Sequence, residues 1–268
     1  MNDDQLRQQP PLRTVIIGSG NVASVVVPQL EASGAIDVVA VYSPTPGHAD
    51  RLARQLKNAR GVSRPEDVPT DAGLYLVAIK DDAIATLAKD FDRNGGVWLH
   101  TSGGVDASAL SPLTDDYGVF YPLQTYSRGV EVNLAEVPVF IEGNSQRALQ
   151  TARRLGDAVS PKVYEVTSDQ RARLHAAAVF ACNFTNHMWA IADDILRRET
   201  GTDLSVLAPL VRETMRKALL IRPAEGQTGP ARRHDLQVID HHCALLRPDE
   251  AKIYRFLSDE IMKYHELN

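Results

Sequence analysis

The chain has 268 residues, of which 44% are hydrophobic, and it carries 29 basic against 34 acidic side chains. This length and composition allow one large domain or two ordinary ones, each with a buried core. The slight acidic excess, without any run of Lys and Arg, argues against a protein that binds nucleic acid through a basic surface.

Two cysteines, Cys182 and Cys243, occur in the chain, and neither lies in a CxxC pair. Because two cysteines are too few for a disulfide framework, we expect reduced thiols, as in the cytosol. The opening MNDDQLRQQPP lacks the apolar stretch of a signal peptide, and no segment is apolar over the length of a bilayer. The sequence therefore predicts a cytoplasmic protein with no membrane partner and no nucleic-acid partner.

In chain order, residues 1–12 have the composition of a disordered lead-in. Short β-branched runs then alternate with helical patterns over residues 13–166. This alternation predicts an α/β fold with a doubly wound, mostly parallel sheet of the Rossmann type. The predicted strands are 13–18, 37–42, 74–79, 97–100, 118–121, 139–142 and 162–166, and the predicted helices are 21–33, 47–57, 81–91 and 145–156.

The pattern changes to helices alone over residues 167–268. Thr167 and Gln170 have the spacing of a capping box, and no proline or glycine follows before Gly201, which predicts one helix reaching Thr200. Further helices are expected at 203–220, where Pro209 divides or kinks the pattern, and at 232–246 and 249–266. These elements predict an all-helical second domain.

A glycine motif, G-x-G-x-x-A, links the first predicted strand to the first predicted helix. In this context it is typical of a dinucleotide-binding loop, because its backbone can approach a pyrophosphate and the helix N-terminus offers free N–H groups. The alternative is a glycine turn without a ligand. The cofactor-binding residues expected from this motif are Gly18, Ser19, Gly20, Asn21, Val22 and Ala23.

The end of the second predicted strand favours NADP over NAD. The strand ends at Tyr42 and is followed by Ser43, where an NAD enzyme commonly has an acid that holds the ribose 2′-OH. The hydroxyls of Ser43 and Thr45 suit a 2′-phosphate. Arg51 and Arg54 on the next helix either add positive charge there or are simply solvated. NADP is the expected cofactor, with NAD possible.

Two further strand ends are expected at the same edge of the sheet, where ligands bind in open α/β folds. Asp81 and Asp82 follow one strand and read equally well as a helix N-cap. The turn HTSGG follows the other, and its small residues and hydroxyls suit a nicotinamide ribose or a substrate. The cofactor contacts expected here are Ile79, Lys80, Asp81, Thr101, Ser102 and Gly103.

The long predicted helix carries a polar stripe. At about 100° per residue, His175, Cys182 and Asn186 fall within about 40° of one another, and Asn183 lies beside them. Burying such groups without partners is costly. Either they bond one another structurally or the stripe lines a site.

Downstream, Lys217 is either a proton donor near a cofactor or a surface lysine on an amphipathic helix. The loop from Glu225 to Arg232 is rich in glycine and polar residues, and it either begins a helix in the ordinary way or faces a substrate. A second group of possible ligands lacks a recognised metal-ligand spacing, so no metal is predicted. Its members are His234, Asp235, His241, His242 and Cys243.

Several motifs together make the chain resemble bacterial Rossmann-like NADP oxidoreductases with a C-terminal helical domain of unknown function. They are GSGNVA, VAIKDDAI, LHTSG, GVFYPLQTYS, LHAAAVFACNFTNHM and QTGPARRHD, and they cover nearly the whole chain. The family is distantly similar to pyrroline-5-carboxylate reductase, ketopantoate reductase and 6-phosphogluconate dehydrogenase-like hydroxyacid dehydrogenases.

The resemblance implies a helical domain that forms a homodimer, and an active site in a cleft between the two domains. In the hydroxyacid dehydrogenases the long helix carries a catalytic lysine followed by asparagines. Here His175 stands in the approximate place of that lysine, with Asn183 and Asn186 beyond it. Histidine can be a general acid near neutral pH, but the substrates of these relatives do not carry over.

We therefore expect an NADP-dependent oxidoreductase that reduces a small carbonyl or imine substrate. His175 is the expected proton donor, with Lys217 as second choice, and Asn183 and Asn186 orient the substrate. The alternatives are an NADP(H)-binding sensor without turnover and a metal-dependent hydrolase that uses the late histidines. The expected substrate contacts are Tyr121, Gln124, Thr125, Gln227, Thr228 and Arg232.

Overall fold

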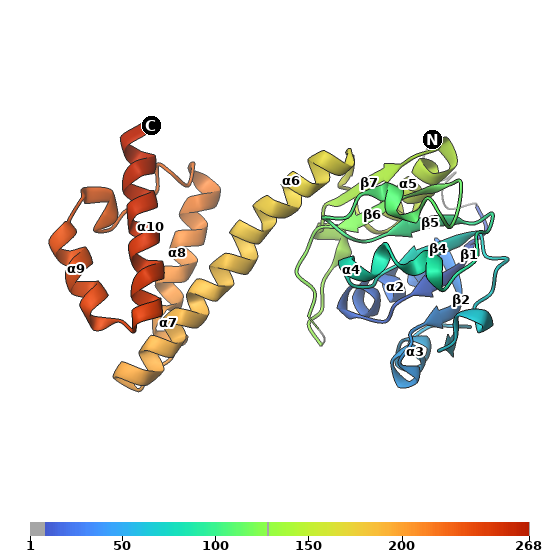
Figure 1. Ribbon diagram of the computed structural model, residues 1–268, viewed down its shortest axis with the longest axis horizontal. Coiled ribbons are helices and arrows are strands. Elements are labelled where there is room, and N and C mark those ends of the chain that lie inside the picture. Colours follow the sequence, from blue (N-terminus) through green and yellow to red (C-terminus); the bar gives the residue numbers. More distant parts are fainter. Residues whose placement is uncertain (1–8, 128, 268) are drawn as a thin grey trace. The chain divides into compact units, whose positions relative to one another are not determined.

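The computed structural model of the chain describes residues 9–127 and 129–267. The chain divides into two compact units, the first ending at Cys182 and the second beginning at Asn183 (Figure 1). The predicted boundary between 166 and 167 falls earlier in the chain. Of the predicted lead-in, residues 1–8 lie outside the described residues, and Leu12 is already the first residue of a strand.

The described part of the first unit contains an eight-stranded sheet in the order β3-β2-β1-β4-β5-β6-β7-β8. All neighbouring strands are parallel except β6 and β7, which confirms the predicted mostly parallel Rossmann sheet. The strand order reverses between β1 and β4, where ligands bind at the carboxyl ends of the strands. The strands are β1 (Leu12–Ile17), β2 (Ile36–Tyr42), β3 (Arg60–Val62), β4 (Leu74–Val77), β5 (Val97–His100), β6 (Tyr117–Pro122), β7 (Val139–Gly143) and β8 (Val163–Glu165).

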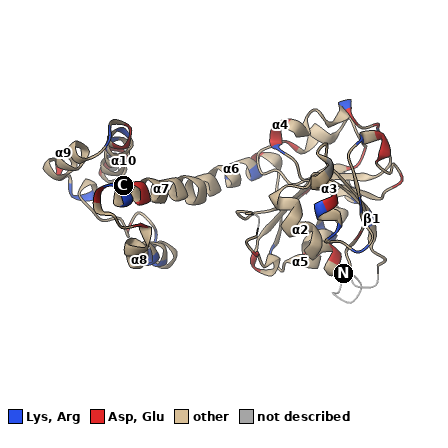
Figure 2. Ribbon diagram, turned by 90° about the horizontal axis from the view of Figure 1, so that it is seen from below, with Lys and Arg blue, Asp and Glu red and all other residues tan. Residues whose placement is uncertain are grey.

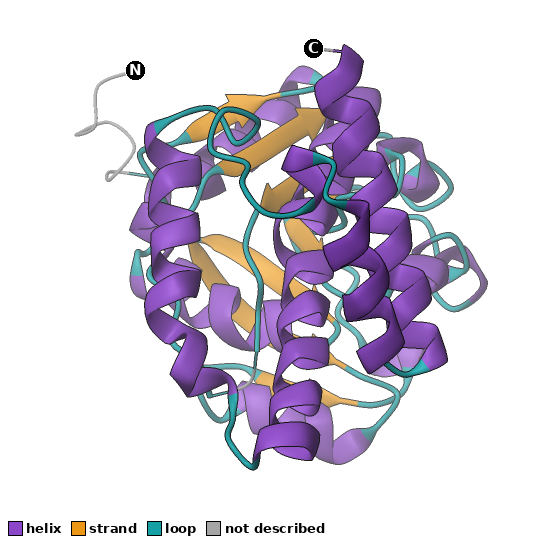
Figure 3. Cartoon of the chain, turned by 90° about the vertical axis from the view of Figure 1, so that its left-hand side faces the viewer, coloured by secondary structure: helices purple, strands orange, loops and turns teal. Residues whose placement is uncertain are grey.

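Helices and 3₁₀ turns of the first unit cover both faces of this sheet, whose strands are orange in Figure 3. On one face, α2 (Asn21–Ala32) and α5 (Gln146–Val159) pack against each other and bury the larger apolar cluster, together with α3 (Pro46–Ala53). On the other face, α4 (Asp81–Ile84) and short 3₁₀ turns cover a cluster that contains Trp98. The strands between them are apolar on both sides, as a doubly covered parallel sheet requires.

The predicted helix 81–91 is wrong in its length. Helix α4 ends at Ile84, and a 3₁₀ turn follows at Leu87–Lys89. The hydroxyl and the N–H of Thr86 both bond to the carbonyl of Ala83, so side chain and backbone share an acceptor one short turn back. Such local bonds of a threonine compete with α-helical ones.

The long helix predicted to Thr200 is also more complex than expected. It begins at Thr167 with the predicted capping box and runs as α6 (Ser168–Ala178). A π-helical segment, Val179–Phe184, follows, and then α7 (Thr185–Thr200), which ends at Gly201 with φ of +67°. Because π turns hold more residues than α turns, the uniform 100° spacing that placed the polar stripe on one face is incorrect.

The rest of the second unit is helical, as predicted. A 3₁₀ turn precedes α8 (Ala208–Leu220), so Pro209 lies in the first turn of that helix and divides the predicted element. The predicted helix 232–246 is interrupted at His234, whose φ is +55°, and α9 (Leu236–Leu245) begins after Asp235 caps it. The last helix is α10 (Pro248–Leu267).

Basic and acidic residues both occur in each of the two units (Figure 2). Many of them form exposed pairs, such as Arg13 with Asp71 and Arg173 with Asp169, which contribute little stability each. Within the described residues, none of the helices has the length and apolarity needed to cross a bilayer.

Candidate functional site

The glycine loop between β1 and α2 has the geometry of a dinucleotide cradle. Gly18 has φ of +108°, and a Cβ there would collide with the carbonyl oxygen of Ala78 and lie 2.8 Å from Cγ2 of Ile79. Its N–H donates to the carbonyl of Tyr42 at 2.8 Å, which draws the turn toward β2. Only glycine adopts such a turn without strain, as predicted from the motif.

The next glycine leaves space for a ligand. Gly20 is the N-cap of α2, and a Cβ on it would meet only the Ala78 oxygen, at 4.0 Å. No side chain caps this end of α2, and its first turn has no acidic residue, so its N–H groups and positive dipole end face outward. Ala23 is fully buried where the helix meets the sheet. These residues fit the pyrophosphate of a dinucleotide.

Asn21, also expected at the cofactor, has a structural contact that the sequence did not indicate. Its side-chain amide donates to the carbonyl of Tyr126 at 3.0 Å, and this bond ties the start of α2 to the loop after β6. Because the side chain of Asn21 has this partner, its backbone N–H is the donor that the residue offers at the N-terminus of α2. Ser19 and Val22 lie in the same loop and first turn.

At the end of β2, Ser43 is buried, and its N–H donates to the carbonyl of Val62 on β3 at 3.1 Å. Tyr42 packs edge-on against Phe91, with 5.1 Å between ring centroids, so its side chain belongs to the core. Arg64 lies two residues beyond β3 and is a cation that the sequence analysis missed. The reason is that β3 has only three residues, and its pattern was not recognised as a strand.

The turn after β5 is held together by its own polar groups. His100 is buried, its Nδ1 accepts from the N–H of Ser102 at 3.2 Å, and the oxygen of Ser102 accepts from two further backbone N–H groups. The hydroxyl of Thr101 donates to the carbonyl of Val77. The hydroxyls expected to be free for a ligand are therefore engaged in shaping the turn.

Burial, with the guanidinium of Arg171 as the second cause, lowers the pKa of His100 to about 4. The ring is therefore neutral at physiological pH. Its second nitrogen, Nε2, lies 3.4 Å from the carbonyl of Asp106. A neutral ring that accepts at Nδ1 carries its proton on Nε2, so both nitrogens of His100 bridge the ends of the turn.

His175 is half-buried and lies beside this turn. Its Nδ1 is 2.9 Å from the hydroxyl of Tyr121, which lies near the end of β6, and the two rings meet edge to face. A Cβ on Gly103 would lie 2.6 Å from Nδ1 of His175 and 2.7 Å from Cζ of Tyr121. Glycine at this position is thus what allows the imidazole and the phenol to pack on the turn.

Asp81 lies on the other side of the same turn. A Cβ atom on Gly104 would lie 3.7 Å from Oδ2 of Asp81 and 3.8 Å from Cδ2 of His175. Burial, and in second place the charge of Asp81, raise the pKa of Tyr121 to about 12. Three predicted residues from separate elements, Asp81, Tyr121 and His175, are therefore brought together around the turn.

A buried ion pair anchors the start of α6. Arg171 is 1% exposed, bonds to the carboxylate of Glu142 on β7, and donates to the carbonyl of Val105 in the loop after the turn. Ser168 donates to the same carboxylate at 2.9 Å. This ion pair was not predicted from the sequence, although an arginine one helical turn before His175 was the available signal.

The other predicted residues of the first unit are exposed, except Ile79, which is half-buried. Lys80 and Asp81 stand at the start of α4, and Ile79 contacts the Gly18 turn. Gln124 and Thr125 lie in the loop after β6, where the amide oxygen of Gln124 accepts from the N–H of Thr125 at 2.7 Å.

The remaining predicted residues belong to the second unit. Asn183 and Asn186 are exposed, as are Thr228 and Arg232. Lys217 pairs with Glu213 at 3.7 Å, and the side chain of Gln227 donates to the carbonyl of Thr228. Their expected roles, as proton donor or substrate contacts, stay predictions.

No three His, Cys, Asp or Glu side chains gather as a metal site in the part of the chain that the structure describes. The late histidines have other contacts: His242 lies 2.7 Å from the hydroxyl of Tyr254, and His234 lies 3.7 Å from Glu266.

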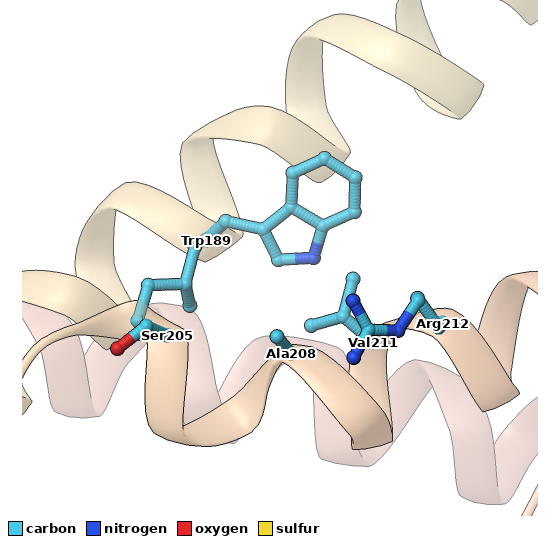
Figure 4. Close-up of a pocket in the computed structure, with 6 residues that line it drawn as sticks. Trp189, Ser205, Ala208, Val211 and Arg212 are labelled. Atoms are coloured by element: carbon cyan, nitrogen blue, oxygen red, sulfur yellow. The ribbon is translucent and has the colours of Figure 1, made fainter.

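The second unit also has a hollow of about 330 Å³ between α7 and α8 (Figure 4). The indole of Trp189 lies over it and Arg212 stands at its rim. None of the predicted site residues lines it. The lining residues are Trp189, Leu204, Ser205, Ala208, Val211 and Arg212.

Comparisons with known proteins agree with this architecture. A Rossmann-like domain matches residues 1–125, and a domain of unknown function, DUF2520, matches residues 137–261. A comparison with curated protein sequences finds no match.

Among solved structures, the chain is similar to a "putative NADP oxidoreductase" from Bacteroides fragilis, with 35% identity and a TM-score of 0.87 over 95% of this chain and 99% of that one. More distant structures share the fold. A reductive aminase from Aspergillus terreus in complex with NADPH and ethyl-5-oxohexanoate has 15% identity and a TM-score of 0.69, over 96% of this chain and 95% of that one. A 1-pyrroline-5-carboxylate reductase from Streptococcus pyogenes has 14% identity and a TM-score of 0.62, over 95% of this chain and 100% of that one.

The similarity to the Bacteroides fragilis protein extends over nearly the full length of both chains. The Rossmann-like match lies within the first unit, whereas the DUF2520 match begins in the first unit and covers most of the second. The chain belongs to the family of Rossmann-like proteins that carry a DUF2520 domain.

Proposed function

We propose that this protein is an NADP(H)-dependent reductase of a small carbonyl or imine compound. The observation that supports this most is the pair of Tyr121 and His175, which packs on the Gly103 turn. Because β1, β4, β5 and β6 run parallel, that turn lies at the same edge of the sheet as the Gly18 loop. A titratable group thus stands at the edge where a dinucleotide would bind.

The proposed cofactor is NADP rather than NAD. The end of β2 carries Ser43 in place of an acid, and the adjacent end of β3 is followed by Arg64. Arg64 is exposed, and its Nε donates to Glu66 at 2.7 Å. A guanidinium beside a hydroxyl is suited to a ribose 2′-phosphate, which accepts charge-assisted hydrogen bonds.

In the proposed reaction, bound NADPH would supply a hydride to the carbon of a C=O or C=N bond. The imidazolium of His175 would give a proton to the oxygen or nitrogen of that bond, and the neutral imidazole would then regain a proton from water. One hydride and one proton convert a carbonyl to an alcohol, or an imine to an amine. A histidine suits this step because its ordinary pKa is close to neutral.

The test is NADPH consumption, followed at 340 nm, by the full-length protein with a panel of small ketones, aldehydes and cyclic imines. We expect turnover with at least one class, and we expect a His175→Gln variant to lose most of it. A matched control is His48→Gln, an exposed histidine on α3. Tight NADPH binding without turnover of any compound would favour the alternative, a nucleotide-binding sensor.

We further propose that the second unit pairs with a second copy of itself. Of its described residues, only Ala231, Ile239 and Ser258 are buried, whereas Leu219 is 81% exposed and Leu210 is 63% exposed. Helices with so little core of their own need another surface to cover their apolar faces. Light scattering should give twice the 29.4 kDa mass of one chain, and a monomer would contradict the proposal.

A further inference from the structure

We infer that Tyr121 is a positioning residue that holds the neutral imidazole of His175 in its Nε2–H form. Because the phenol occupies Nδ1, Nε2 is the nitrogen that would face a substrate and give up a proton from the doubly protonated ring. The role of Nε2 rests on the proposed reductase function, whereas the tautomer is a property of the protein alone and can be tested without a substrate.

The direction of the hydrogen bond carries the inference. The phenol of Tyr121 is protonated at neutral pH, as that of an ordinary tyrosine is. Burial raises its pKa further, to about 12. Within the described residues, its hydroxyl has no hydrogen-bond partner besides Nδ1 of His175, at 2.9 Å. A buried hydroxyl proton that can reach a ring nitrogen donates to it, since an unused donor is costly. Nδ1 is then an acceptor, and the ring proton resides on Nε2.

The packing around the pair keeps the ring in this orientation. Gly103 lies against both rings, so the imidazole cannot tilt toward the turn. Arg171, one turn earlier on α6, is anchored to Glu142 and sets the position of the helix turn that carries His175. No other hydrogen bond of His175 is present in the part of the chain that the structure describes, so Nε2 is available.

Charged groups face the pair from three elements. Asp81 at the start of α4 and Arg171 on α6 both act on the phenol, and they oppose each other: the carboxylate raises the pKa of Tyr121 and the guanidinium lowers it. Glu142 on β7 is held by Arg171. When the ring carries two protons, Nδ1–H can donate to the same phenolic oxygen, so one contact holds the ring in both protonation states. Transfer of the Nε2 proton would leave the Nδ1–H ring bonded to that oxygen, and proton exchange with water would restore the Nε2–H form.

The experiment is two-bond ¹H–¹⁵N correlation spectroscopy on full-length protein labelled at histidine, at a pH where the imidazole of His175 is neutral. The signals of His175 are identified by their loss in His175→Gln. We compare wild type with Tyr121→Phe, which removes only the hydroxyl. The control is Tyr126→Phe, a second partly buried tyrosine, whose hydroxyl bonds to the carbonyl of Pro122. Circular dichroism verifies that each variant is folded.

We expect wild type and Tyr126→Phe to show the Nε2–H form alone, and Tyr121→Phe to show a mixture of both tautomers. An Nδ1–H form in wild type would mean that the phenol accepts instead, and it would overturn the inference. An unchanged tautomer in folded Tyr121→Phe would also overturn it, because the ring would then be held by something else.

Activity measurements separate the tautomer of His175 from the proton-donor role of its Nε2, which rests on the proposed function. With a substrate in hand, Tyr121→Phe should lower kcat roughly threefold to tenfold, as expected for loss of one hydrogen bond. It should also move the limb of the pH profile that His175 sets, and leave the KM for NADPH unchanged. A fixed tautomer together with full activity of His175→Gln would refute the proton-donor role and leave the positioning of the ring intact. A uniform loss of kcat without any change in the pH profile would indicate a merely structural tyrosine.

Discussion

Arg171 and His175 lie one helical turn apart on α6, and the buried guanidinium of Arg171 fixes the turn that carries the imidazole of His175. The guanidinium reaches both Glu142 on β7 and the carbonyl of Val105, so α6 is attached to the sheet and to the loop beside it. Residues at this spacing lie on the same face of a helix. The position of the candidate proton donor therefore depends on an ion pair that has no part in the proposed chemistry.

Replacing Arg171 by Leu should lower the free energy of unfolding by about 3–5 kcal/mol, because the carboxylate of Glu142 loses its partner in a largely buried setting. Urea unfolding measures this change. The exposed pair of Arg173 with Asp169 on the same helix provides the control, and Arg173→Ala should cost less than about 1 kcal/mol. Equal costs for the two variants would show that Arg171 is not an anchor.

Gly103→Ala should disrupt the pair of Tyr121 and His175. The added Cβ would lie 2.6 Å from Nδ1 of the imidazole, which is closer than packed atoms approach. Overpacking of this kind costs about 1–3 kcal/mol. Gly104→Ala is the matched control, since its nearest contact would be an ordinary 3.7 Å. Thermal unfolding and the His175 nitrogen signals should both change in the first variant only, and a tolerated Gly103→Ala would contradict the packing described.

Alanine substitutions of the two glycines in the dinucleotide loop should have different effects, one on stability and the other on NADPH binding. Gly18→Ala forces a side chain into a left-handed turn against Ala78, so we expect a less stable protein. Gly20→Ala has free space toward the protein, so its stability should be close to that of wild type. Its added methyl group would, however, occupy the surface that a pyrophosphate approaches. Calorimetric titration with NADPH should therefore show weak binding by a well-folded Gly20→Ala protein, and unchanged affinity would argue against this loop as the phosphate site.

Arg64 should decide between the two nicotinamide cofactors. Arg64→Ala is expected to weaken NADPH binding about tenfold or more and to leave NADH binding nearly unchanged, since only the former has a 2′-phosphate. Arg13→Ala is the control, because Arg13 lies near the start of β1, at the amino ends of the parallel strands and not at the carboxyl ends, where Arg64 follows β3. Glu66→Gln should strengthen NADPH binding, because Glu66 competes for the guanidinium. Loss of NADPH affinity in Arg51→Ala or Arg54→Ala instead would assign the charge to α3.

Stability should fall as the pH drops from about 6.5 to about 4 because of His100. Burial holds its pKa near 4 in the folded protein, whereas the unfolded chain takes up the proton near the ordinary value of 6.5. The unfolded state thus binds more protons in this window, and its stability relative to the folded state increases by about 3 kcal/mol at most. His100→Gln should remove this part of the pH slope of urea unfolding, while His48→Gln should not. An unchanged slope in His100→Gln would contradict a buried neutral ring.

The features that could be predicted from the sequence are those that depend on neighbours along the chain. The loop from Gly18 to Ala23 is one, since its glycines are needed for local dihedral angles and close approach. The start of α6 at Thr167 is another, because a capping box closes within four residues. The order of strands and helices followed from periodicity for the same reason.

Short or irregular elements were harder to predict from the sequence, because their local residue patterns do not differ from those of loops or of ordinary helices. The three residues of β3 are too few to show an alternation, and Arg64 was missed with them. The π-helical segment from Val179 to Phe184 cannot be read from apolar spacing, since it differs from an α-helix only in which carbonyl each N–H reaches. For that reason, the uniform spacing that placed the polar stripe on one helix face does not hold across this segment.

The amino-acid sequence by itself determined the Rossmann sheet, the dinucleotide loop and the presence of His175 on a helix. The tertiary structure alone decided what that histidine contacts: Tyr121 is 54 residues away, and the anchor between Arg171 and Glu142 spans 29. Such pairs depend on which strands lie side by side and on how a helix packs against them. That arrangement is set by burial of the whole core, and burial constrains which residues are apolar without specifying which polar groups meet.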